Sequence, residues 1–162
     1  MSFQLGSIST GTLRNEDLLP RFTYALGELA HNPHTNTSVF KSTELAEVWQ
    51  DGINMIKLID EGYCADEPNL YGIIDRLCDA LNEYAPPYVH FGTNEGDGAD
   101  FGFWPDIDSL STDIRYSEYR KLNGHHDEQI LLPDEGILVH INDHGNVTVM
   151  NMWTHEVYWE CV

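Results

Sequence analysis

Residues 86–108 read PPYVHFGTNEGDGADFGFWPDID, and this stretch organises the rest of the chain. Two aromatic, β-prone runs, 88–91 and 101–104, flank an acidic, glycine-rich loop. Before the stretch, apolar residues recur at helical spacing; after it, β-branched and aromatic residues cluster as they do in strands. The stretch is therefore predicted to join a helical first half to a sheet-rich second half.

Three helices are predicted in the first half, over about 15–31, from Ser42 to about residue 61, and over about 67–85. Ser42 is the expected N-cap of the second helix, and Gly52 interrupts its apolar pattern. Residues 31–38 have the composition of a loop. The third helix carries the clearest apolar stripe, which is formed by Leu70, Ile73, Ile74, Leu77, Leu81 and Tyr84.

The second half predicts a C-terminal β-hairpin, with strands at 137–141 and 147–153 around a turn at 142–146. Residues 157–159 form an expected last strand, 107–123 fit either a short helix or strands, and 124–128 have the composition of a polar loop. We therefore expect an α+β fold in which about three N-terminal helices pack on one face of a four- to five-stranded antiparallel sheet. The length predicts a single domain over residues 1–162.

Charge is the strongest feature of the composition. The chain has 27 acidic residues against 8 lysines and arginines, a formal net charge of −19. Sixteen of the acids and only Lys57 and Arg76 fall within residues 42–113, which gives that region a net charge of −14. Such a field repels nucleic acid and anionic membranes, and it steers the protein toward basic partners. Keeping the protein soluble is the simpler explanation of the same charge.

The compartment predicted from the sequence is the cytoplasm. The first residues lack the basic segment followed by an apolar segment that is typical of a signal peptide. No apolar run reaches the roughly 18–20 residues of a membrane span. Three cysteines without a CxxC motif fit a reducing environment. The strong negative charge and the missing apolar span argue against a membrane partner, and the charge also argues against direct binding to nucleic acid. A homodimer stays open.

Enzyme motifs are absent from the sequence: it has no GxSxG, Walker, GxGxxG or HExxH pattern, and no cofactor is expected. Glu95, Asp97 and Asp100 in the central loop carry oxygen ligands of the kind that Ca²⁺ or Mg²⁺ prefers. Their spacing does not match an EF-hand, so no metal site is predicted there. A metal-dependent hydrolase that uses these loop acids stays an alternative.

The acids of the predicted helices are spaced in rows. Residues four apart lie on one helix face with about 6 Å between neighbours, which is close to the spacing of backbone phosphates. Two rows result, Glu44, Glu47 and Asp51 on the second helix and Asp75, Asp79 and Glu83 on the third. A solvated helix face is the plain interpretation of such rows. Imitation of a nucleic-acid backbone in a basic groove is the functional one.

Three segments resemble a group of small acidic proteins, mostly uncharacterised, that bacteriophages and integrative or conjugative elements encode. They are TGTLRNEDLLP at 10–20, GDGADFGFWP at 96–105 and NDHGNVT at 142–148. The resemblance spans nearly the whole chain, with looser similarity between the motifs. It implies no catalytic residue or cofactor, but it implies a setting in which accessory proteins antagonise host nucleic-acid machinery, including restriction and CRISPR effectors. No known anti-restriction or anti-CRISPR motif occurs in the chain.

The sequence thus predicts a non-enzymatic inhibitor of the anti-CRISPR or anti-restriction type, which would bind a basic nucleic-acid-handling protein of the bacterial host by DNA mimicry. The predicted contact residues are Glu44, Glu47, Asp51, Asp75, Asp79, Glu83, Glu95, Asp97 and Asp100. The alternative is an immunity or antitoxin-like module that binds a toxin through aromatic anchors. Candidate anchors are Trp104, Trp153, Tyr158 and Trp159.

Overall fold

The computed structural model describes residues 2–32, 37–63, 67–123 and 127–161. By its internal contacts the chain divides into two compact units. The helical unit comprises Gly6–Ala85 and Phe91–Trp104. The sheet unit comprises Met1–Leu5, Pro86–His90 and Pro105–Val162.

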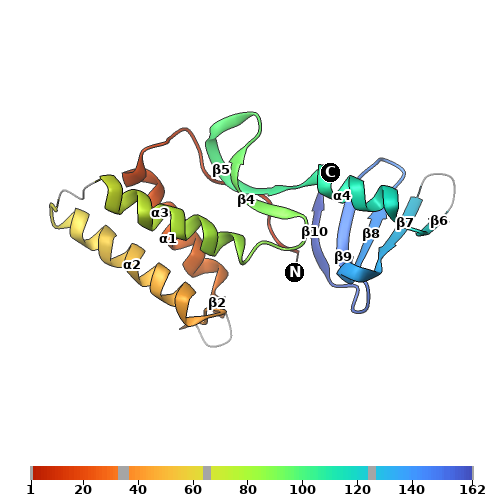
Figure 1. Ribbon diagram of the computed structural model, residues 1–162, viewed down its shortest axis with the longest axis horizontal. Helices are drawn as coiled ribbons and strands as arrows, with labels where there is room; N and C mark the ends of the chain where they lie inside the picture. Colours follow the sequence, from red (N-terminus) through yellow and green to blue (C-terminus); the bar gives the residue numbers. More distant parts are fainter. Residues whose placement is uncertain (1, 33–36, 64–66, 124–126, 162) are drawn as a thin grey trace. The chain divides into compact units, whose positions relative to one another are not determined.

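The helical unit contains the three predicted N-terminal helices, α1 (Asn15–Leu29), α2 (Thr43–Asp60) and α3 (Glu67–Asn82) (Figure 1). The predicted N-cap of α2 is confirmed, since the Ser42 hydroxyl accepts a hydrogen bond from the Leu45 N–H at 3.3 Å. The apolar stripe predicted for α3 is buried from Leu70 to Leu81. Apolar spacing therefore placed all three helices correctly, because each has one side to bury.

A three-stranded sheet in the order β1–β5–β4 lies largely within the helical unit. Its strands are β1 (Gly6–Ser9), β4 (Val89–Asn94) and β5 (Asp97–Pro105), so both aromatic runs of the central stretch become strands. The rings of Phe91 and Phe103 lie 5.1 Å apart, and Phe22 of α1 meets Phe91 at 5.0 Å. This aromatic cluster fixes the sheet against α1, because edge-on ring pairs add to the burial of apolar area.

Gly52 in the middle of α2 has a packing role that its sequence context did not reveal. It is buried, and the side chain of Thr23 from α1 occupies the space where a Cβ would stand. The Thr23 hydroxyl in turn donates to the Leu19 carbonyl oxygen at 2.7 Å, so Thr23 is held in place. Gly52 therefore allows α1 and α2 to approach closely, at the cost of lower helix propensity.

The sheet unit is built on an antiparallel five-stranded sheet with strand order β10–β9–β8–β7–β6 (Figure 1). The strands are β6 (Tyr119–Asn123), β7 (Asp127–Leu132), β8 (Ile137–Ile141), β9 (Val147–Asn151) and β10 (Val157–Cys161). The 3-10 helix η1 (Pro133–Glu135) joins β7 to β8, and α4 (Ile107–Tyr116) precedes β6. The predicted C-terminal hairpin is present as β8 and β9, with Val139 opposite Val149.

The sheet unit has its own core. Trp159 is fully buried, and its indole N–H donates to the Pro87 carbonyl oxygen at 2.7 Å. The carboxylate of Asp106 caps α4 by accepting from the Ser109 N–H at 2.9 Å. Around them the buried cluster consists of Leu110, Ile130, Leu132, Ile137, Val139, Val149 and Trp159.

The structure corrects the predicted arrangement in three places. The three N-terminal helices share a unit with a three-stranded sheet, whereas the five-stranded sheet lies in the other unit with a fourth helix, α4. Asp127 and Glu128 begin strand β7 instead of ending a polar loop, since Ile130 and Leu132 further along that strand are buried. In the predicted loop 31–38, the short strands β2 (His31–Asn32) and β3 (Thr37–Ser38) pair; residues 33–36 lie outside the described ranges.

The length and the apolar character of each helix decide whether it could span a membrane. Within the described ranges, each helix is too short or too polar to cross a bilayer.

Asn82, at the end of α3, ties the helices to the sheet of the helical unit. Its side-chain amide donates to the Phe91 carbonyl oxygen at 3.0 Å, and its oxygen accepts from the Phe91 N–H at 2.8 Å. Because Asn82→Ala would leave both Phe91 backbone groups unpaired, we expect it to lower the free energy of unfolding by about 1–3 kcal/mol. Chemical denaturation measures this loss. Asn69→Ala, an exposed change on the same helix, should have a much smaller effect; equal losses would contradict the role of Asn82.

Gly52→Ala is expected to destabilise the helical unit by about 1–3 kcal/mol, because the new Cβ overlaps the Thr23 side chain. The matched control is Gly72→Ala on α3, where a Cβ meets nothing within 4 Å. That control should gain up to about 1 kcal/mol from helix propensity. Thermal unfolding of both variants, together with Thr23→Ala/Gly52→Ala, tests the contact. A double variant no more stable than Gly52→Ala alone would show that the contact is not the cause.

Candidate functional site

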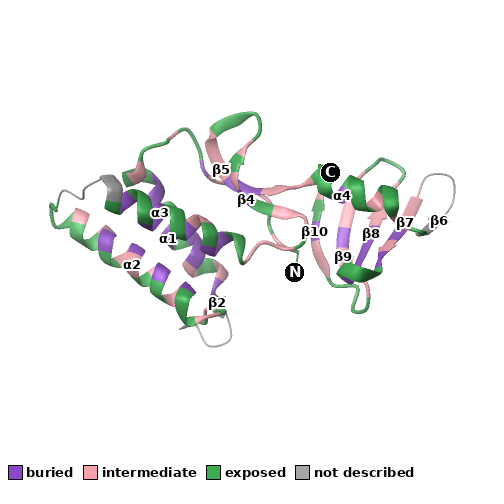
Figure 2. Cartoon of the chain, in the orientation of Figure 1, coloured by how far each residue is buried: buried purple, intermediate pink, exposed green. Residues whose placement is uncertain are grey.

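The predicted carboxylate rows are on the exposed sides of α2 and α3, which are green in Figure 2. Within the α2 row the Asp51 side chain is 47% exposed. The other five carboxylate residues are all classed as exposed: Glu44, Glu47, Asp75, Asp79 and Glu83. The solvent-facing position of the rows, predicted from spacing alone, is therefore confirmed.

An ion pair joins the two rows. The Arg76 guanidinium of α3 lies 2.8 Å from the Asp51 carboxylate of α2, and both side chains are about half exposed. Just beyond the C-terminal end of α3, the Lys41 ammonium donates to the Glu83 carbonyl oxygen at 2.6 Å. Residue numbers rise in opposite directions along the two helices at these contacts, so α2 and α3 are antiparallel.

The ion pair also shows that the rows border the same seam. Glu44 and Glu47 precede Asp51 by seven and four residues, and Asp79 and Glu83 follow Arg76 by three and seven. Residues at these separations share a side of a helix. The rows therefore run along one outer side of the α2–α3 pair, which we call the acidic helix face: Glu44, Glu47, Asp51, Asp75, Asp79 and Glu83.

Two cations reduce the negative charge of this face locally. Arg76 pairs with Asp51, and the Lys41 ammonium stands 4.6 Å from the centre of the Tyr84 ring. An exposed pair such as Arg76–Asp51 contributes only about 0–1 kcal/mol to stability, so its carboxylate stays available to another cation. The remaining acids of the face make no ion pair within the described ranges.

Glu44 has a structural role as well as a place on the face. It lies in the first turn of α2, where a negative charge meets the positive end of the helix dipole. Hydrogen bonds from its own backbone N–H and from the Ser42 hydroxyl hold the pKa of its carboxyl below the ordinary value of 4.5. These hydrogen bonds therefore favour the ionised form of the Glu44 carboxyl.

The three acids of the central loop are placed apart from the acidic helix face. They lie at or near the tip of the β4–β5 hairpin, which extends away from α2 and α3 in Figure 1. The Asp97 carboxylate accepts from the Ala99 N–H at 2.9 Å and shapes the turn, and Glu95 is exposed. One Asp100 oxygen is buried without a hydrogen-bond partner. The sequence grouped these acids with the rows, but the fold separates them.

A metal-binding cluster and an activated cysteine nucleophile are two further kinds of site that the described part of the chain could contain. Within the described ranges, no three histidine, cysteine, aspartate or glutamate side chains are grouped so that they could hold a metal ion. Burial, and then the nearby charges of Asp75 and Asp79, raise the pKa of the Cys78 thiol to about 11. At neutral pH this thiol is protonated, so Cys78 is not an activated nucleophile.

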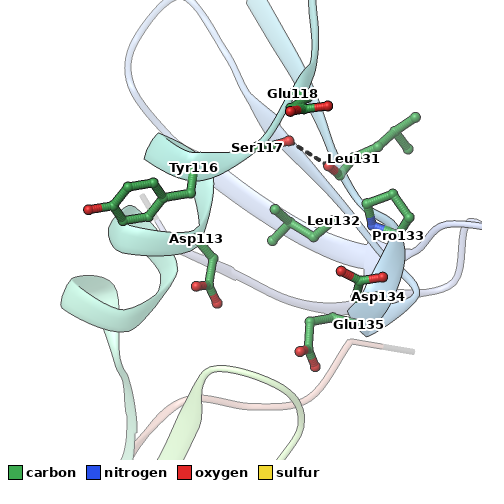
Figure 3. A pocket seen from close by; sticks show the side chains of 9 residues that line it. All are labelled: Asp113, Tyr116, Ser117, Glu118, Leu131, Leu132, Pro133, Asp134 and Glu135. Carbon is green, nitrogen blue, oxygen red and sulfur yellow. Dashed lines mark hydrogen bonds between the residues drawn. The ribbon is translucent and has the colours of Figure 1, made fainter.

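A second candidate site, which we call the α4–η1 groove, lies in the sheet unit (Figure 3). It has a volume of about 520 Å³ and combines an apolar surface with four carboxylates. Its lining residues come from the end of α4, the end of β7 and η1: Asp113, Tyr116, Ser117, Glu118, Leu131, Leu132, Pro133, Asp134 and Glu135. No sequence signal marks it, because residues about twenty positions apart meet only when β7 folds back beside α4.

Tyr88 supports one side of this groove. Its hydroxyl donates to the Asp113 carboxylate at 2.6 Å, and its backbone has a left-handed φ of 59°. Burial, followed by the Asp113 hydrogen bond and the negative charges of Asp113 and Glu135, raises the pKa of Tyr88 well above its usual value. Asp113 and Glu135 both line the groove, and the negative charge of each disfavours ionisation of the Tyr88 hydroxyl.

The predicted aromatic anchors divide sharply in exposure. Trp159 is buried, Trp104 and Tyr158 are partly buried and hydrogen-bonded to Gly92 and Asn151, and Trp153 is 71% exposed. The Trp153 ring lies against Gly136, where a Cβ would stand 2.6 Å from the indole Cζ3. The left-handed φ of 68° at Gly136 also favours glycine, so a side chain at this position would be strained and would meet the Trp153 ring.

Comparison with known proteins assigns none of these surfaces to a family. No family model matches the chain, and neither a curated protein nor a solved structure is similar enough to count as a match.

Proposed function

We propose that the protein is a non-enzymatic inhibitor whose acidic helix face occupies a basic, nucleic-acid-binding groove of a bacterial host protein. This is inhibition of the anti-CRISPR or anti-restriction type, by imitation of a nucleic-acid backbone. The observation that carries the proposal is the Arg76–Asp51 pair, because it puts both carboxylate rows on one side of two antiparallel helices.

The arrangement of charge favours a nucleic-acid-binding partner over an arbitrary basic surface. Neighbouring carboxylates in each row are about 6 Å apart along the helix. Two such rows side by side present two roughly parallel lines of negative charge, as the two strands of a duplex do. A groove that uses lysine and arginine to neutralise phosphates would gain the same electrostatic attraction from this face.

The cost of the face also supports a functional role. Like charges four residues apart destabilise a helix by about 0.2–0.5 kcal/mol per pair. The α3 row contains two such pairs, Asp75–Asp79 and Asp79–Glu83, and within the described ranges neither is relieved by an ion pair. The apolar side of α3 is buried and compensates for this repulsion.

Capture and charge reversal test the proposal. The immobilised protein should retain a basic nucleic-acid enzyme from a bacterial lysate, and excess duplex DNA should release it. Asp75→Lys/Asp79→Lys/Glu83→Lys should weaken binding to that enzyme at least tenfold and flatten its dependence on salt, because three screened contacts are lost.

The control for this test changes charge equally at exposed positions elsewhere, with Glu28→Lys/Glu156→Lys/Glu160→Lys. It should lower the affinity less than threefold. Thermal unfolding shows whether each variant is folded. Unchanged affinity in the α3 triple variant, or equal losses in both, would refute a specific role for the row.

Trp153 favours a second candidate function, an immunity-like module that binds one protein partner. Tryptophan is enriched among interface hot spots, and Trp153 is 71% exposed. If this function holds, Trp153→Ala should reduce affinity for the captured partner at least tenfold while leaving the melting temperature within about 2 °C. The exposed Tyr24→Ala is the control for loss of an aromatic ring. A partner that DNA releases and that tolerates Trp153→Ala would exclude this second function.

A further inference from the structure

We propose that the α4–η1 groove binds an arginine side chain presented by a segment of a partner protein. This site is in the sheet unit and does not depend on the acidic helix face, which is in the helical unit.

The shape of the groove suits a long side chain with a charged end. Leu132, which is only 7% exposed, contributes the apolar floor, and Pro133 lies beside it. Figure 3 shows the Leu132 side chain between the end of α4 and η1, with Asp134 and Glu135 beyond it. An arginine stem packs on apolar surface while its guanidinium reaches a polar rim, and this groove offers both.

The carboxylates at one end of the groove lack a cation. Asp113 on α4 and Glu135 on η1 both line the groove, and the Asp113 carboxylate accepts a hydrogen bond from the Tyr88 hydroxyl at 2.6 Å. Asp134 adds a third negative charge next to them (Figure 3). Within the described ranges no lysine or arginine pairs with any of the three. A cation bound in the groove would reduce the repulsion among these three carboxylates. The charge of the groove is therefore complementary to a cationic occupant.

Arginine fits the groove better than lysine for two reasons. Its planar guanidinium donates to two carboxylates at once, whereas lysine acts as a single point of charge. It also stacks on aromatic rings, and Tyr116 at the rim is 77% exposed and free to receive it. Figure 3 shows the Tyr116 ring directed outward from α4, on the side away from η1.

The test uses the full chain and a fluorescein-labelled tetra-arginine peptide, with affinity measured by fluorescence anisotropy. Asp134→Asn/Glu135→Gln removes two charges from the groove, and the control Glu28→Gln/Glu156→Gln removes two exposed charges that belong neither to the groove nor to the acidic helix face. We expect the groove variant to weaken peptide binding at least tenfold and the control variant less than twofold. Tetra-lysine should bind several-fold more weakly than tetra-arginine.

A second variant distinguishes binding in the groove from attraction by the net charge of the protein. Tyr116→Ala leaves the net charge unchanged and should weaken tetra-arginine binding about two- to fivefold, without a comparable effect on tetra-lysine. Equal losses in the groove and control variants would show that only overall charge attracts the peptide, and that result overturns the proposal. Absence of wild-type binding, or unchanged affinity in the groove variant, overturns it as well. None of these outcomes depends on the acidic helix face being functional.

Discussion

The hydrogen bonds between the Asn82 side chain and the Phe91 backbone are the constraint on which the helical unit depends. They join the last residue of α3 to the strand that follows the two prolines at 86 and 87. With Phe91 held there, its ring reaches both Phe22 of α1 and Phe103 of β5. Because buried backbone groups must be paired, the Asn82 side chain supplies a partner for both backbone groups of Phe91 in β4. The position of α3, and with it one carboxylate row, follows from this attachment.

Packing of the helices determines which acids become neighbours. Gly52 and Thr23 set the close approach of α1 and α2, and α3 packs against both. This packing turns the α2 row toward α3, where Arg76 and Asp51 meet. The negative face is thus a consequence of apolar burial on the opposite side of each helix. Surface charge of this kind adds little to stability, so its value lies in attraction to partners.

Much of the helical unit could be predicted, because the information is local. Ser42, the stripe from Leu70 to Leu81 and the proline pair at 86–87 each signal a boundary or a buried side within one or two helical turns. The same holds for the β8–β9 hairpin, whose turn residues lie between two β-branched runs. Strand β7 was missed because its acidic start resembles a loop, and burial of Ile130 and Leu132 depends on strands paired on both sides. The separation of the loop acids from the helix rows was equally hidden, since it depends on the direction of the β4–β5 hairpin.

The sequence by itself determined the charge of the protein, the acid spacing on each helix and the helix and hairpin positions, because these depend on composition and on periodicities of a few residues. Only the tertiary structure decided that both rows border one seam, that the five-stranded sheet has a core of its own, and that Trp153 is exposed while Trp159 is buried. It alone formed the α4–η1 groove. The physical reason is that these features join residues distant along the chain, and burial of apolar surface, which has no fixed sequence spacing, brings them together.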